Sequence, residues 1–214
     1  MRMFAMSNVL YVEFGQTVNL ETNAKVHALD CAVRSAAFPW LLESVPSYST
    51  LAISFDCSVA TTQEVQEAIR RLSETTKPGK MGNTAATFEL GVHYGGEDGP
   101  DLSALAKNAG LTEDEAVSIH TSRTYTCYML GFTPGFVYLG DVNDRIATPR
   151  RSTPRTRVQE GSVGIAGKQT GFYGVSSPGG WQIIGRLVEK TFNVSRDPPS
   201  VIQPGDRVRF KRAD

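Results

Sequence analysis

The ten residues "TPRRSTPRTR" (148–157) carry four arginines and two prolines and no acidic residue. A guanidinium group is permanently charged and donates paired hydrogen bonds to a carboxylate or a phosphate. Pro149 and Pro154 fix their backbone φ angles and disfavour a helix, so the arginines stand on a stiff segment. This pattern predicts an anion-binding segment, and the simpler interpretation is a solvated loop whose arginines pair with surface carboxylates. Asp144 and Glu160 are the flanking acidic residues that would neutralise it.

A second stretch, "GSVGIAGKQTG" (161–171), has glycine at every third or fourth position. Glycines let backbone N–H groups approach a ligand closely, and Lys168 would add a positive charge. The stretch nevertheless lacks both the G-K-[ST] of a phosphate-binding P-loop and the G-x-G-x-x-G spacing of a dinucleotide site. Glycines at barrel corners and bulges are therefore the preferred explanation.

Aromatic residues are concentrated between these stretches and after them. "LGFTPGFVYLG" (130–140) places Phe132, Phe136 and Tyr138 among glycines and a proline, which predicts a constrained loop. They are candidates for one wall of a ligand pocket or of a subunit interface, although core packing of at least two of them is the simpler expectation. Trp181 follows a Pro-Gly-Gly turn, where its ring stacks on a ligand or fills the end of a barrel.

His120 is expected at the carboxyl end of a helix. The negative end of the helix dipole stabilises the protonated ring, so we expect a raised pKa and a role in anion binding or proton transfer, or an ordinary stabilising cap. His27 and His93 have no other metal-ligating residue at suitable spacing, so no metal site is predicted. A nucleophile elbow of the G-x-S-x-G type is also absent from the sequence.

The N-terminal part of the chain alternates strand and helix signals. A β-rich run precedes a stretch with helical spacing, two further β-rich runs flank a turn, and a helix opened by the capping box of Thr61 and Glu64 follows. These elements occupy residues 8–14, 17–38, 40–45, 50–56 and 61–74. The order strand, helix, strand, strand, helix makes up most of a ferredoxin-like split βαβ unit.

The stretch 74–87 contains two glycines and a proline and no periodic apolar residues, so it is predicted to be a linker. We therefore expect two domains, residues 1–86 and residues 87–214. In the second, an alternating strand (87–94) and two short helices, one opened by Asp101 and one by the capping box of Thr112 and Glu115, precede a glycine-rich region. Short strands separated by turns then favour a compact barrel or sandwich, with candidates at 124–130, 162–167, 181–187 and 207–210.

Composition limits the classes of function. The 214 residues contain 22 basic and 22 acidic side chains. The chain therefore lacks the excess of positive charge that proteins use to bind nucleic acid without sequence specificity. The three cysteines, Cys31, Cys57 and Cys127, are far apart and odd in number, which favours reduced thiols and a cytoplasmic protein. The first fifteen residues are too polar for a secretion signal, and no run approaches membrane-spanning length.

Three long motifs resemble one protein family. They are "YGGEDGPDLSALAKNAGLTEDEAVSIHTSRTYTCYMLGFTPGFVYLG", "RIATPRRSTPRTRVQEGSVGIAGKQTGFYGVSSPGGWQIIGR" and "IQPGDRVRF", in that order. The family is the B subunit of ATP-dependent bacterial 5-oxoprolinase, also labelled allophanate hydrolase subunit 1, and it includes Kip-type inhibitors of a sporulation histidine kinase. The resemblance implies an α+β chain with an N-terminal ferredoxin-like domain and a C-terminal cyclophilin-like β-barrel.

The resemblance also implies an activity. Such a chain pairs with a carboxyltransferase-like second subunit and, together with a third subunit, opens the lactam of 5-oxoproline to L-glutamate at the expense of ATP. Magnesium would accompany the ATP, with no ligands identifiable in this chain; the substrate is a small molecule, and neither nucleic acid nor membrane is implied as a partner. The expected site comprises three catalytic candidates, His120, Arg150 and Arg151, and six residues that would bind substrate or ATP, Tyr138, Arg155, Lys168, Gln169, Thr170 and Trp181.

Departures from the family pattern leave the substrate open. Val137 stands where a proline is expected, Asp141 replaces a second glycine, and Lys168 replaces the glycine before Gln169. One alternative is therefore a subunit that acts on allophanate or another amide. Another is a regulator, without enzymatic activity, that binds a sensor histidine kinase. A prolyl isomerase is disfavoured because the arginine and aromatic motif of cyclophilin active sites is missing, and fold alone does not confer function.

Overall fold

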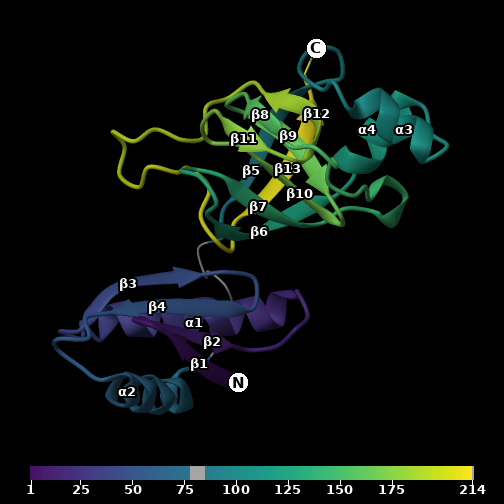
Figure 1. The fold of residues 1–214 in the computed structure, drawn as a ribbon. Coiled ribbons are helices and arrows are strands. Elements are labelled where there is room, and N and C mark those ends of the chain that lie inside the picture. The colour runs from purple at the N-terminus through teal and green to yellow at the C-terminus, as the bar shows by residue number, and fades with distance from the viewer. Residues whose placement is uncertain (78–84, 214) are drawn as a thin grey trace. The chain divides into compact units, whose positions relative to one another are not determined.

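The computed structural model describes residues 1–77 and 85–213, and the chain divides into two compact units, Met1–Asn83 and Thr84–Asp214 (Figure 1). Of the predicted linker at 74–87, residues 78–84 lie outside the described part of the chain. Each unit has its own hydrophobic core, as expected for an α+β chain of two parts.

The N-terminal unit is a four-stranded antiparallel sheet with two helices. Its elements are β1 (Arg2–Met6), β2 (Val9–Glu13), α1 (Leu20–Ser35), β3 (Leu41–Pro46), β4 (Thr50–Phe55) and α2 (Thr62–Thr75). The strand order β1-β2-β4-β3 places β4 between the two strands that α1 connects, which is the predicted split βαβ arrangement. Strand β1 was not predicted; it occupies the sheet edge beside β2 and joins it through a two-residue turn at Ser7 and Asn8.

Local capping signals explain where these helices begin. The Asn19 side chain accepts a hydrogen bond from the Thr22 backbone N–H at the start of α1. The predicted capping box of Thr61 and Glu64 is confirmed at the start of α2. Both helices cover the sheet with apolar side chains, among them Val26, Leu29, Val33, Val65 and Ile69, which form one core with Leu10, Val12, Leu51, Ile53 and Phe55 of the strands.

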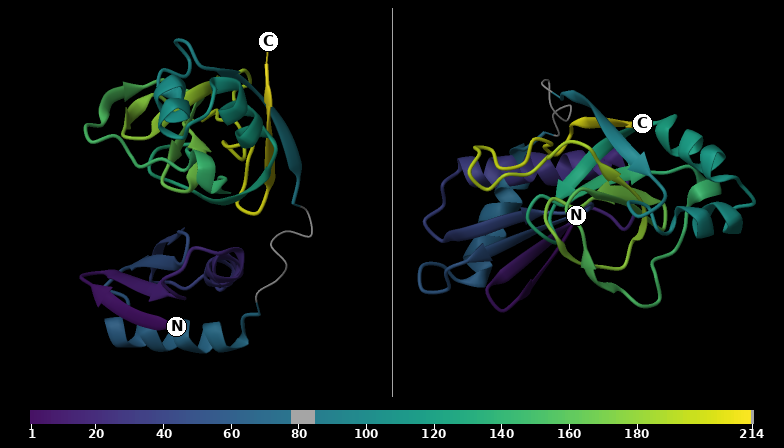
Figure 2. Two further views of the ribbon diagram at one scale, coloured as in Figure 1. Left: turned by 90° about the vertical axis from the view of Figure 1, so that its right-hand side faces the viewer. Right: turned by 90° about the horizontal axis from the view of Figure 1, so that it is seen from above.

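The second unit is a closed barrel of seven strands, shown from two further directions in Figure 2. In spatial order the strands are β10 (Gln169–Phe172), β7 (Val137–Asp141), β6 (Thr124–Leu130), β13 (Arg207–Arg212), β5 (Thr87–Tyr94), β12 (Gln182–Leu187) and β9 (Ser162–Ala166). β13 and β5 pair in parallel, and the other neighbouring strands of the described barrel pair antiparallel. The expected barrel is therefore confirmed.

Several barrel elements differ from the sequence prediction. The stretch predicted as a constrained loop contains strand β7. The glycine-rich stretch 161–171 forms a hairpin of β9, which was expected at 162–167, and β10, which was not expected. Part of the arginine segment is strand β8 (Arg155–Val158), which pairs with β11 (Ser177–Gly179) in a separate ribbon. These strands are short and contain glycine or charged residues, so no clear alternation marks them in the sequence.

Two glycines of the hairpin are required by packing. A Cβ atom at Gly171 would lie 2.4 Å from the carbonyl oxygen of Val137, and one at Gly164 would lie 3.1 Å from Cβ of Trp181. Trp181 belongs to a cluster of buried side chains separate from the barrel core, together with Phe136, Val158, Ala166, Tyr173 and Ile183. The Trp181 side chain thus packs against the hairpin at Gly164, where a larger residue would crowd it.

Two helices, α3 (Leu102–Asn108) and α4 (Glu113–Thr121), connect β5 to β6. α3 packs on β12, and α4 packs on β13. Thr112 and Glu115 form the predicted capping box of α4, whereas Asp101 occupies the N-cap position of α3 without a hydrogen bond from its side chain to the helix. Among the described helices, none has the length and apolarity needed to cross a membrane.

Candidate functional site

The arginine segment binds a carboxylate, and that carboxylate is Asp101 of the same chain. Arg151 Nη1 donates to Asp101 Oδ1 at 3.0 Å, and Arg155 donates from Nη1 to Oδ2 at 2.9 Å and from Nη2 to Oδ1 at 2.8 Å. The backbone N–H of Ile183 donates to Oδ2 at 2.6 Å. The Asp101 side chain is only 8% exposed, so its charge is buried and satisfied by four donated hydrogen bonds.

The flanking acids do not neutralise the segment, so that prediction is wrong. Asp144 pairs with Lys168 at 2.7 Å, and Glu160 lies 3.5 Å from Lys190. Asp101 was missed because it is about fifty residues away along the chain; only the packing of α3 against β12 brings it to the arginines.

Hydrogen bonds hold the backbone on both sides of Arg150. The Thr148 backbone bonds with Gly167 in both directions, Pro149 O accepts from Gln182 Nε2 at 2.9 Å, and the Arg151 N–H donates to Gly180 O at 2.8 Å. The Arg150 side chain is exposed. Burial raises the pKa of the Tyr138 phenol, and the Arg150 guanidinium partly opposes this shift, so the two groups are neighbours.

His120 is buried inside the barrel, and the expectation of a raised pKa is wrong. Desolvation lowers its pKa to about 3 and outweighs the dipole of α4. Thr170 Oγ1 donates to Gly164 O at 3.0 Å and lies 2.9 Å from His120 Nε2, so Nε2 carries the proton and donates to Thr170. Nδ1 then accepts from the Tyr94 hydroxyl at 2.7 Å. The neutral ring bridges β5 and β10, and Thr170 takes part in this internal chain of bonds.

The remaining predicted residues lie elsewhere. Lys168 and Gln169 are at the β9–β10 turn, where Lys168 forms its exposed ion pair with Asp144. Tyr138 and Trp181 pack together in the aromatic cluster, with ring centroids 5.8 Å apart. The nine candidates are therefore distributed over the Asp101 cluster, the barrel interior, the hairpin turn and the aromatic cluster, and the structure does not bring them together in one cavity.

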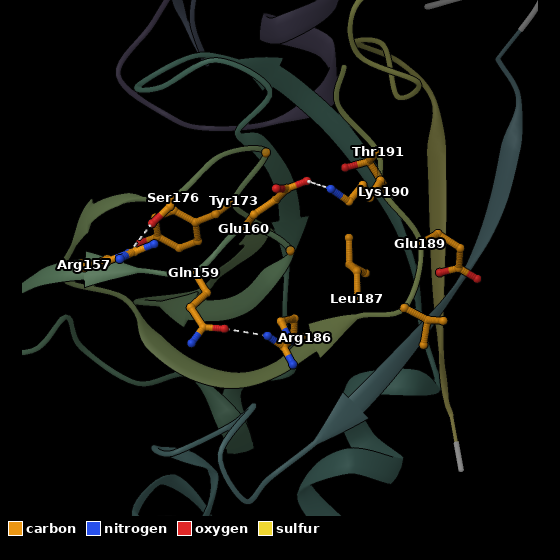
Figure 3. Close-up of a pocket in the computed structure, with 13 residues that line it drawn as sticks. Arg157, Gln159, Glu160, Tyr173, Ser176, Arg186, Leu187, Glu189, Lys190 and Thr191 are labelled. Carbon is orange, nitrogen blue, oxygen red and sulfur yellow. Dashed lines mark hydrogen bonds and ion pairs between the residues drawn. The ribbon is translucent and has the colours of Figure 1, made fainter. Parts of the chain in front are cut away.

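A groove of about 360 Å³ lies beside the arginine segment instead (Figure 3). Arg157 lines one side of it, Arg186 and Lys190 line the other, and Leu187 lies between them. A smaller cavity of about 150 Å³, which Arg155 lines, shares Arg157 and Arg186 with the groove. Sequence reasoning missed this set because Arg186 and Lys190 follow Arg157 by some thirty residues, with no motif that links them.

The groove retains hydrogen-bond donors for an anion. Arg157 Nε donates to the Ser176 hydroxyl at 3.0 Å, and among the described residues Arg157 has no carboxylate partner. Arg186 Nη1 donates to Gln159 Oε1 at 2.5 Å, and its Nη2 pairs with Asp98 at 2.6 Å. The contact of Lys190 with Glu160 is long, at 3.5 Å. Guanidinium and ammonium groups anchored in this way can bind a carboxylate or a phosphate.

The Asp101 cluster yields a stability prediction. We expect Asp101→Asn to lower the free energy of unfolding by about 3–5 kcal/mol, because two arginines lose their buried counter-charge. The matched control is Asp144→Asn, which breaks an exposed ion pair and should change stability by about 0–1 kcal/mol. Denaturant unfolding of both variants measures this, and equal effects would contradict a buried cluster.

The buried His120 yields a pH prediction. Its pKa is about 6.5 when unfolded and about 3 when folded, so its contribution to stability is complete above pH 6.5 and is lost as the pH falls towards 3. The loss is up to about 1.4 kcal/mol per pH unit. We expect the stability advantage of the wild type over His120→Gln to shrink in urea unfolding between pH 7 and pH 4.5. A constant difference across that range would show that the folded ring takes up a proton.

Comparison with known proteins identifies the family. Residues 3–202 match the family model "Carboxyltransferase domain, subdomain C and D". The chain is 36% identical to the 5-oxoprolinase B subunit of Bacillus subtilis over 219 residues, covering 96% of this chain and 89% of that protein. The solved structure of TTHA0988 superposes with a TM-score of 0.84 at 34% identity, covering 96% of this chain but 40% of the longer TTHA0988 chain. A conserved uncharacterized protein of Pyrococcus horikoshii is 44% identical with a TM-score of 0.59, covering 98% and 96% of the two chains. The chain therefore belongs to the carboxyltransferase-domain family and, within it, to the relatives of the 5-oxoprolinase B subunit.

Proposed function

We propose that this chain is the B subunit of an ATP-dependent 5-oxoprolinase, which converts 5-oxo-L-proline, ATP and water to L-glutamate, ADP and phosphate. The observation that carries the proposal is family membership along nearly the whole chain, with a relative of that name covered over 89% of its length. The proposed complex contains a carboxyltransferase-like second subunit and a third, hydrolase subunit, and acts in the cytoplasm.

The chemistry requires charge neutralisation more than a strong acid or base. An unactivated amide is a poor electrophile, and phosphorylation of its oxygen creates a good leaving group. Phosphoryl transfer depends mainly on positioning the reactants and stabilising negative charge. We propose that Arg157, Arg186 and Lys190 bind an oxyanion of the reactants in the groove, either the 5-oxoproline carboxylate or a phosphate of ATP. His120, buried and neutral, holds the barrel together instead of transferring protons to substrate.

The site residues predicted from the sequence take on separate roles here. Arg151 and Arg155 brace the arginine segment through Asp101, and Arg150, exposed beside Tyr138, is the second place where an anion can bind. Among the described residues, no group of three or more His, Cys, Asp or Glu side chains is arranged to hold a metal ion.

Steady-state kinetics of the assembled complex test the groove. We expect Arg157→Ala and Arg186→Ala each to raise KM for 5-oxoproline or ATP by at least about tenfold, because a hydrogen bond to a charged group contributes about 1.5–3 kcal/mol. Arg209→Ala, an exposed arginine on β13, is the matched control and should leave KM unchanged. If Arg150→Ala raises KM and the two groove variants do not, the anion site lies at Arg150 and the groove assignment is wrong.

The substrate is tested in the same assay. We expect ATP hydrolysis by the complex to depend on 5-oxoproline and to stay at its basal rate with allophanate and with linear amides. Stimulation by allophanate and none by 5-oxoproline would overturn the proposed activity.

A further inference from the structure

The segment after β12 folds into a protruding arm (191–201), visible in yellow-green to the left of the barrel in Figure 1. The two sides of the arm are joined by backbone hydrogen bonds from Val201 to Thr191 and from Asn193 to Pro199, each at 2.9 Å. Arg196 Nη2 donates to Thr191 O at 2.9 Å and to Pro199 O at 2.8 Å. The arm is therefore cross-linked internally, and its shape is set before any partner binds.

The arm exposes an apolar tip and rests on a neighbouring loop. Val194 is 80% exposed. At the base, Phe192 packs against Gly135 so closely that a Cβ atom at Gly135 would lie 2.4 Å from the Phe192 ring. The arm and the β6–β7 loop thus form one continuous surface.

The β6–β7 loop contains a strained and exposed aromatic residue. Phe132 has a φ of 67°, a conformation that bulky residues rarely adopt, and it remains 63% exposed. Strain of this kind costs about 1–3 kcal/mol and is concentrated at binding and switch sites. The ring makes an edge-to-face contact with Phe136, with ring centroids 5.9 Å apart, and the residue nevertheless stays largely exposed.

Between the arm and the loop lies a depression of about 620 Å³. Its apolar lining comprises Pro134, Val175, Phe192 and Val194. At its rim stand Glu160 and Lys190, which also line the anion groove. A partner that fills the depression therefore contacts two residues of the groove.

We propose that this arm face, comprising Phe132, Pro134, Val175, Phe192 and Val194, docks the carboxyltransferase-like partner subunit; the inference rests on the proposed function. In TTHA0988 the matched region is 40% of a longer chain, so there the equivalent region is covalently joined to further polypeptide. A partner surface that fits this face presents an apolar side chain to the depression and a carboxylate to Lys190, whose side chain is 81% exposed. Docking excludes water from the groove and strengthens the interaction of its cations with the bound oxyanion.

Binding to the purified partner subunit without substrate tests the proposal, with complex formation measured by size-exclusion chromatography and calorimetry. We expect Val194→Glu to raise the dissociation constant at least about tenfold, because it places a charge in an apolar contact. The matched control, Val59→Glu, alters a valine that is 53% exposed in the N-terminal unit and should bind as the wild type does. Both substitutions are at exposed positions and should leave the melting temperature unchanged.

The variant Phe132→Gly distinguishes a role of Phe132 in partner binding from a role in the stability of the fold. Glycine adopts a positive φ without strain, so we expect this variant to melt at a higher temperature than the wild type while binding the partner more weakly. Wild-type affinity in both Val194→Glu and Phe132→Gly would overturn the docking proposal, as would failure of the wild-type chain to bind the partner. A dimer of the isolated chain that Val194→Glu abolishes would assign the face to a second copy and also overturn it. A complex that assembles through this face but does not cleave 5-oxoproline would leave the docking intact and reject the proposed function.

Discussion

A buried carboxylate, that of Asp101, determines how the second unit is assembled. Left unpaired, it would cost several kcal/mol, and four donated hydrogen bonds remove that cost. The donors come from two separate parts of the chain, the arginine segment and the start of β12, while Asp101 itself stands at the start of α3. One side chain thereby joins three segments, in addition to the packing of α3 on β12 and the backbone hydrogen bonds between Arg151 and Gly180 and between Asp101 and Ile183. The stiff, arginine-rich segment is in this respect an internal brace.

Because Asp101 binds two of the arginines, it determines which positive charges of the segment remain available to a ligand. Of the four arginines in the segment, Arg151 and Arg155 face Asp101, while Arg150 is exposed and Arg157 lines the groove. Because the groove and the depression beneath the arm share Glu160 and Lys190, the proposed anion site and the proposed docking face are neighbours. On this proposal the chain carries half of a site, which a partner subunit completes.

The sequence was informative where a local pattern decides structure. Capping boxes located α2 and α4, and alternating apolar residues located strands such as β5, because both signals act within a few residues.

The sequence was uninformative where tertiary contacts decide the local structure, the pKa or the partner of a side chain. The pattern predicts a loop where strand β7 lies, because its glycine and the preceding turn conceal the alternation of apolar residues. The pKa of His120 moved opposite to the direction expected from the helix end, because burial outweighs the dipole. The partner of the arginines could not be found by proximity along the chain, since only the packed barrel brings Asp101 to them.

A double-mutant cycle on the free energy of unfolding tests the central claim most directly, using Asp101→Asn and Arg155→Ala singly and together. A shared buried interaction predicts a coupling energy of about 1.5 kcal/mol or more, while the parallel cycle of Asp101→Asn with Arg157→Ala should be additive to within about 0.5 kcal/mol. Additive effects in the Arg155 cycle would mean that the two side chains stabilise the fold independently, and the arginine segment would then have to be explained without Asp101.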